Sequence, residues 1–288
     1  MQILRHIYIL CIITILGGCG AGQQDTRDAI AVSFEPQAWM VKQIAGDDID
    51  IVTLLPAGSD PEVYQPSIST MKILGNAKAY LTLGTSGFEQ SITDNISKNF
   101  PDLKIIDSGK GVEKIYGLHG NPESNDMATT TEFDPHLLTS IRNCKIIVRN
   151  ITETMVELYP EKAKEYLEAG TALFEKLAAL DDSITGMRLK GKSFTIRHPS
   201  LSYYARDYGI EQIALSEVGK ETSPLQLKQQ IDASAMSRPA VMIVEKEHAT
   251  SSDYATSRQL GTDTIQVSLN TAGWLNDLIR ISNEINRD

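Results

Sequence analysis

The side chains with the clearest chemical potential stand just after short apolar segments of this 288-residue chain. They are two histidines, His136 and His198, one glutamate, Glu62, and one asparagine, Asn270. Imidazole nitrogens and carboxylate oxygens are common donors to divalent transition metals. Each residue by itself has an ordinary explanation, since a lone histidine or asparagine after a strand usually serves turn or hydrogen-bond chemistry. A shared function depends on whether the fold brings them together.

Short apolar runs alternate with amphipathic stretches, first from about residue 29 to 107 and again from about 193 to 286. The runs predict strands at 29–34, 49–55, 79–84, 104–108, 193–198, 210–216, 240–246 and 264–270. The amphipathic stretches predict helices at 36–46, 68–77, 87–97, 200–208, 224–237, 252–260 and 272–286. Such alternation is typical of βαβ units, whose mostly parallel sheets carry helices on both faces. The sequence therefore predicts an α/β protein with two lobes.

A long helical pattern separates the two sets, from about residue 150 to 187. Its apolar positions keep near-helical spacing: Ile151, Met155, Leu158, Ala163, Tyr166, Leu167, Leu173, Leu177 and Leu180. Gly170 lies on the same stripe and costs about 1 kcal/mol relative to alanine. Pro160 would kink or restart the helix, so two helices are an alternative. We predict a rigid helix that joins the lobes, because no sustained heptad repeat indicates a coiled coil.

Open α/β sheets bind ligands beyond the carboxyl ends of their strands, and the four polar residues lie at such positions. His136 follows the segment 109–133, which is rich in Gly, Asn and Thr, has no period and is predicted to be a loop. Asp134 and Pro135 are typical of an N-cap and first helical residue, which would place His136 in an exposed first turn.

Composition limits the classes of function. Apolar residues make up 41% and charged residues 22%, which is typical of a soluble globular protein. The formal charge of −10 argues against nucleic-acid binding, which needs a clustered basic surface. With five histidines in all, the chain cannot be a histidine-rich metal sponge. His119 falls in the predicted loop and His248 is expected at the surface.

The N-terminus is typical of a targeting segment. Residues 1–18 contain Arg5 and an apolar run of about ten residues, too short to span a bilayer of roughly 30 Å. Leu16-Gly17-Gly18-Cys19 resembles the lipobox at which bacterial lipoproteins are cleaved and acylated. We therefore predict a signal peptide at 1–18, lipidation at Cys19 and a tether at 19–28. The alternative is an ordinary secretory signal with an incidental cysteine.

Cysteine usage predicts no disulfide in the mature protein. Cys11 would leave with the signal peptide and Cys19 would carry lipid, so only Cys144 remains. Its surroundings are apolar and helical, which favours a small core residue over a nucleophile or ligand.

Three motifs resemble those of the metal-binding components of bacterial zinc and manganese ABC importers, the zinc-uptake component A family. Residues 56–64 (PAGSDPEVY) are similar to the family's G-x-D-P-H-x-Y, and 133–136 (FDPH) to its D-P-H after a variable loop. Residues 195–209 (TIRHPSLSYYARDYG) are similar to its H-x-x-F-x-Y-F-A-x-x-Y-G and are the most specific. The resemblance covers essentially the whole mature chain.

The resemblance implies two (β/α)₄ lobes joined by a rigid helix, with one buried metal ion in the cleft. It implies the ligands Glu62, His136, His198 and Asn270, with Zn²⁺ the first choice and Mn²⁺ or Fe²⁺ as alternatives. Two positions depart from the family: glutamate stands where histidine is usual, and Asn270 stands where a carboxylate is usual. A neutral amide leaves the site near +1, so water, Glu217 or Glu245 could complete the coordination.

The resemblance also implies the organisation and role of the protein. The expected N-terminal lobe spans 29–150, the linking helix 151–190 and the C-terminal lobe 191–288. The protein would be a monomer in the periplasm or cell envelope, lipid-anchored to a bacterial membrane. It would not be an enzyme, and its partners would be an ABC permease and ATPase, with no nucleic acid.

Two other functions remain open on sequence grounds. An envelope zinc hydrolase could use three protein ligands and an open position, with Glu245 as general base, but no catalytic signature such as H-E-x-x-H or G-x-S-x-G is present. A non-transporting metal buffer or adhesin would share the fold. Neighbouring genes for an ATPase and a multi-span permease would discriminate this last alternative.

Overall fold

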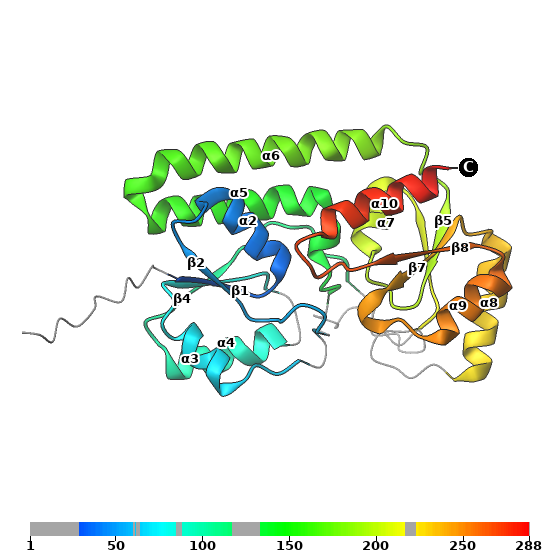
Figure 1. The fold of residues 1–288 in the computed structure, drawn as a ribbon, viewed down its shortest axis with the longest axis horizontal. Helices are drawn as coiled ribbons and strands as arrows, with labels where there is room; N and C mark the ends of the chain where they lie inside the picture. The colour runs from blue at the N-terminus through cyan, green and yellow to red at the C-terminus, as the bar shows by residue number, and fades with distance from the viewer. Residues whose placement is uncertain are drawn as a thin grey trace, which may run out of the picture.

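The chain forms two α/β lobes that lie side by side beneath a long helix (Figure 1). The computed structural model describes residues 29–59, 61, 64–84, 88–116, 133–216 and 223–287. Each lobe holds a four-stranded sheet with every pairing parallel, in the orders β2-β1-β3-β4 and β6-β5-β7-β8. The strands are β1 Ala29–Val32, β2 Asp50–Thr53, β3 Ala79–Thr82, β4 Lys104–Asp107, β5 Ser193–Ile196, β6 Glu211–Ala214, β7 Val241–Glu245 and β8 Asp263–Val267. All eight predicted strands are confirmed.

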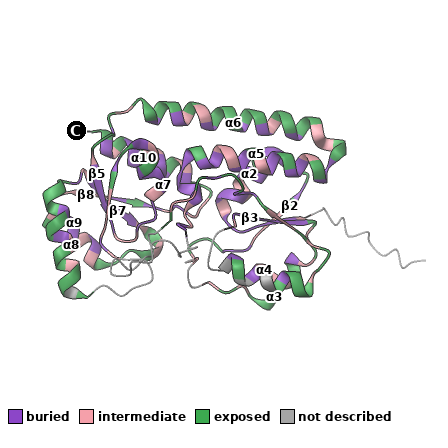
Figure 2. Cartoon of the chain, turned by 180° about the vertical axis from the view of Figure 1, so that it is seen from behind, coloured by how far each residue is buried: buried purple, intermediate pink, exposed green. Residues whose placement is uncertain are grey.

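Helices cover both faces of the N-terminal sheet, as predicted (Figure 1). One face carries α2 (Glu35–Ala45) and α5 (Ile141–Leu158), and the other carries α3 (Ile68–Leu74) and α4 (Phe88–Asn99). The central strands β1 and β3 are almost entirely buried, which explains why they read as continuous apolar runs (Figure 2). Cys144 on α5 is fully buried, so the prediction of a core cysteine is confirmed.

The C-terminal lobe shows how one strand serves two layers. Its helices are α7 (Ser202–Tyr208), α8 (Pro224–Ser237), α9 (Ser251–Leu260) and α10 (Trp274–Asn286). Along β7, Val241 and Ile243 belong to the main core, whereas Met242 and Val244 form a second apolar cluster with residues of α8 and α9. This alternation is the period of two expected when both faces of a sheet are covered.

The linking segment consists of two antiparallel helices rather than one. The helix α5 ends at Leu158, a short 3₁₀ turn spans Pro160–Lys162, and α6 runs from Ala163 to Thr185. Pro160 restarts the helix, because its ring cannot continue the preceding hydrogen-bond ladder. The prediction of a single helix is therefore wrong at Pro160, whereas the long helix that joins the lobes is α6.

The inner stripe of α6 explains the glycine that weakened the sequence pattern. Gly170 packs against Thr152 of α5, and a Cβ at this position would overlap the Thr152 side chain. Tyr166, Leu173 and Leu177 are buried on the same face, but Leu167 is 58% exposed and lies off the stripe. Glycine at this contact therefore lets two helix backbones approach closely.

Several contacts tie the two lobes together along the seam between them. Tyr203 of α7 donates its hydroxyl to the carbonyl of Asp134 at 2.8 Å. The backbone N–H of Ala272 donates to the Glu35 carboxylate at 3.2 Å. Residues of both lobes share one continuous apolar core. None of the described helices is both long and apolar enough to cross a membrane.

Candidate metal site between the lobes

His136 lies in the loop that enters the N-terminal lobe's last helix pair, and Asp134 fixes its ring. The Asp134 carboxylate accepts hydrogen bonds from the His136 backbone N–H at 2.9 Å and from its ring Nδ1 at 2.7 Å. An ionised carboxylate can only accept, so the proton is on Nδ1 and the lone pair of the neutral ring is on Nε2. His136 therefore presents a donor nitrogen toward the other lobe.

The expectation that Asp134 caps a helix is wrong. A 3₁₀ turn spans Leu137–Thr139, and α5 starts only at Ile141, with Ser140 as its N-cap. Asp134 instead bonds to the residue two positions later, the pattern of a local turn formed by an aspartate side chain. His136 is half-buried, with 16% of its side chain exposed, rather than in an exposed first turn.

His198 reaches the same point from the C-terminal lobe. It follows β5, and its Nε2 lies 3.3 Å from the Nε2 of His136. The ring centroids are 5.0 Å apart with an interplanar angle of 68°. The two residues are far apart in sequence, so only the docking of the lobes brings them together.

This nitrogen separation has a direct chemical meaning. In a tetrahedral site with Zn–N bonds of about 2.0–2.1 Å, two ligand nitrogens lie about 3.3–3.4 Å apart. The same separation fits a hydrogen bond between the rings if one Nε2 carries a proton. A divalent cation and a shared proton are thus the two species that such a pair can hold.

The Asp134 carboxylate is placed to support either species. It is 1% exposed, and burial alone would raise its pKa. The hydrogen bonds and the charge of His136 outweigh burial and hold the pKa of Asp134 below its ordinary value. Asp134 therefore stays ionised and orients the imidazole, as carboxylates behind metal-binding histidines do. Sequence reasoning missed this role, although the two-residue spacing of Asp134 and His136 was visible.

Replacing Asp134 should weaken metal binding without removing a ligand. For Asp134→Ala we expect zinc affinity to fall by about 10–100-fold, the usual cost of losing a carboxylate behind a metal-binding histidine. Asp134→Asn keeps an acceptor for the ring N–H and should lose less. Calorimetric zinc titration would measure both, with the exposed Asp102→Ala as the charge-matched control. Equal affinities for wild type and Asp134→Ala would contradict this role.

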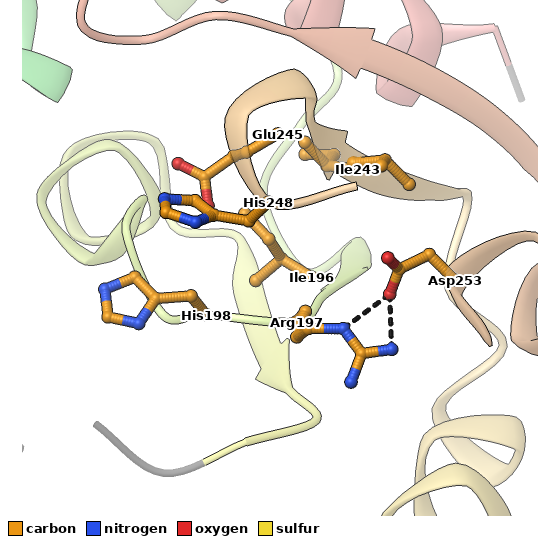
Figure 3. Close-up of a pocket in the computed structure, with 8 residues that line it drawn as sticks. Ile196, Arg197, His198, Ile243, Glu245, His248 and Asp253 are labelled. Atoms are coloured by element: carbon orange, nitrogen blue, oxygen red, sulfur yellow. Dashed lines mark hydrogen bonds and ion pairs between the residues drawn. The ribbon is translucent and has the colours of Figure 1, made fainter. Parts of the chain in front are cut away.

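Glu245 lies at the end of β7, close to this pair. Burial raises the pKa of its carboxyl group, and His136 and His248 oppose that rise through their charges. Glu245 also lines a small cavity together with His198 and His248 (Figure 3). It is the carboxylate nearest to the histidine pair that the structure describes, apart from Asp134.

The other residues predicted for the site are placed less closely or fall outside the description. Asn270 lies in the turn after β8, and within the described chain it makes no hydrogen bond to either histidine. Glu62, Glu217 and Cys19 lie outside the described residues. Over the part of the chain that the structure describes, no three His, Cys, Asp or Glu side chains form a set that could hold a metal ion. The structure thus brings together two of the four predicted ligands.

Two parallel α/β lobes under a long helix, with an imidazole from each meeting at the seam, define a solute-binding protein. Its sequence matches the family described as zinc-uptake complex component A, periplasmic, over residues 30–274. The chain belongs to this family.

Known relatives and structures agree with this assignment. The zinc-binding lipoprotein AdcA of Streptococcus pneumoniae is 27% identical over 227 residues, 75% of this chain and 44% of AdcA. The chain thus spans less than half the length of that relative. A putative metal-binding protein of Chlamydia trachomatis is 28% identical over 210 residues, 72% of each chain. The crystal structure of ZnuA is similar with a TM-score of 0.80 and 27% identity, covering 90% of this chain and 98% of ZnuA.

Proposed function

We propose that this protein is a lipid-anchored extracytoplasmic solute-binding protein that captures one divalent transition metal ion and delivers it to an ABC permease. The observation that carries the proposal is the pair of Nε2 atoms, 3.3 Å apart, contributed by His136 and His198 from opposite lobes. A site divided between lobes can be closed and opened by their movement, which is what capture and release require.

Zinc is the proposed ion, with manganese and ferrous iron as alternatives. Two imidazoles favour zinc over ions that prefer oxygen ligands alone. The relatives named zinc-binding lipoprotein AdcA and the zinc-bound ZnuA deletion mutant, 27% identical in sequence, support the same ion. A manganese-bound relative of the same fold, FpvC of Pseudomonas aeruginosa, shows that the fold itself does not select zinc.

We propose Glu62, His136, His198 and Asn270 as ligands, with Glu62 the only carboxylate among them. One negative charge against a divalent ion leaves the site near +1, so affinity should be lower than with two carboxylates. Glu245, Glu217 or water are the alternatives for completing the coordination. Glu245 is favoured among these by its position beside the histidine pair.

The proposed location and partners follow from the family and the N-terminus. Lipid on Cys19 would hold the protein at a membrane surface, since each buried CH₂ contributes about 0.8 kcal/mol. A short tether would then leave the lobes free to reach a permease with its ATPase. No observation on the described residues favours a hydrolase.

Metal removal and return test the function directly. Protein stripped of metal by a chelator should take up one Zn²⁺ per chain, because a single histidine pair is available at the seam. Mn²⁺ should compete only at excess, and Ca²⁺ should not bind, since it prefers oxygen ligands. Calorimetry with elemental analysis would measure stoichiometry and order of preference. Absence of stoichiometric uptake of zinc, manganese and iron would refute the proposal.

A further inference from the structure

His248 lies on the same cavity as His198, although sequence reasoning placed it at the surface with no role. It ends the 3₁₀ turn Lys246–His248, which follows β7 directly. The residue is exposed, yet it lines the small cavity together with His198 and Glu245. Figure 3 shows the His248 ring beside the Glu245 carboxylate and on the same side of the cavity as His198.

A buried ion pair fixes the loop of His248 to the strand end that carries His198. Arg197, the neighbour of His198, donates from Nε to the Asp253 carboxylate at 2.6 Å. The other oxygen of Asp253 accepts from the Thr250 backbone N–H at 2.7 Å and from its hydroxyl at 2.8 Å. Asp253 is 2% exposed, so this connection is shielded from solvent. The backbone of His248 is therefore held at a set distance from His198.

The side chain of His248 is free to turn toward the histidine pair. Exposed side chains change rotamer within picoseconds to nanoseconds, so its present orientation imposes no barrier. The observation that no three donor side chains yet form a metal set among the described residues means that such a turn is required.

The donor set also leaves a place for a third imidazole. Asn270 offers a neutral amide oxygen, a weak donor, and makes no hydrogen bond to the pair within the described chain. Zinc accepts a set of three imidazoles with one further ligand, and nitrogen donors favour it over manganese.

We propose that His248 is a further metal ligand, which turns onto the ion held by His136 and His198. This inference rests on the proposed function, since it needs an ion at the seam. It makes two of the three imidazoles belong to the C-terminal lobe. The ion would therefore stay with this lobe when the lobes part, and His136 would be the ligand whose approach closes the site.

X-ray absorption at the zinc edge tests the proposal, because multiple scattering from imidazole rings counts the histidine ligands. In zinc-loaded wild type we expect three imidazoles, and in His248→Gln we expect two. Zinc affinity of the variant should fall by at least the about 10–100-fold that loss of even an outer partner costs. The preference for zinc over manganese in competition should narrow as well. Lys246→Ala, an exposed change on the same turn, should match wild type in all three measurements.

Two imidazoles in wild type, with an unchanged zinc affinity in His248→Gln, would overturn the inference. This outcome differs from failure of the proposed function, in which wild type itself would take up no zinc. Since His248 is exposed, the variant should retain the thermal unfolding transition of the metal-free wild type, which shows that any loss is local.

Discussion

Combined replacement of His136 and His198 by alanine is expected to abolish stoichiometric zinc binding. Each histidine contributes the one ring nitrogen that faces the seam, and the two lie 3.3 Å apart. Loss of a ligand weakens binding at least as much as loss of an outer partner. The double variant should therefore be weaker by at least about 10²–10⁴-fold. Calorimetric titration of the metal-free proteins, with zinc analysis after gel filtration, measures the effect.

A matched control separates loss of the site from loss of the fold. Asn99→Ala combined with Gln259→Ala also changes one residue of each lobe, and both residues are exposed. This control should bind zinc like wild type. If the His136→Ala/His198→Ala protein also titrates like wild type, the assignment of the site is wrong, and the two rings share only a proton.

The architecture was predictable because its strands carry a strong local signal. Strands buried on both faces read as apolar runs, and β1, β3, β5 and β7 are buried almost throughout. Turn and capping residues set the helix limits. Ser223 caps α8, for example, and its predicted bounds 224–237 equal the observed ones. The break at Pro160 was foreseen only as an alternative, since a proline can either kink a helix or end it.

The candidate site was only partly predictable, because its decisive contacts join distant residues. Strand-end placement identified His136 and His198, but their facing nitrogens depend on how two lobes dock, which no local pattern reports. The role of Asp134 was misread because Asp-Pro is typical of both an N-cap and a turn. His248 was passed over since its approach to His198 depends on the Arg197–Asp253 ion pair, across 56 positions of sequence.

Trp274→Ala is expected to cost about 3–5 kcal/mol in the free energy of unfolding, the usual range for a buried tryptophan. Trp274 begins α10, is fully buried, and packs edge-on against Trp39 of α2, with ring centroids 5.3 Å apart. Its Nε1–H donates to the carbonyl of Leu138 at 3.0 Å. Removing the indole leaves a cavity at the seam and a buried carbonyl without that partner. Urea unfolding of the metal-free protein measures the loss.

Two further variants show which part of the indole matters. Trp274→Phe keeps a ring against Trp39 but leaves the Leu138 carbonyl without its donor, which should cost about 1–3 kcal/mol. Leu225→Ala, at an exposed position of α8, should change stability by less than about 0.5 kcal/mol. If Trp274→Ala unfolds with the midpoint and slope of wild type, Trp274 does not hold the seam together.

The same variant connects the stability of the seam to metal binding. Leu138 follows His136 by two positions, so the Trp274–Leu138 hydrogen bond anchors the turn just after the proposed ligand. A ligand that binds only the folded state stabilises it by RT ln(1 + [L]/Kd), so saturating zinc should raise the stability of wild type by an amount that reports its affinity. In Trp274→Ala this zinc-dependent increment should shrink, because His136 is no longer held opposite His198. An unchanged increment in a destabilised variant would show that Asp134 and Tyr203 alone position the ring, through their contacts on the other side of the turn.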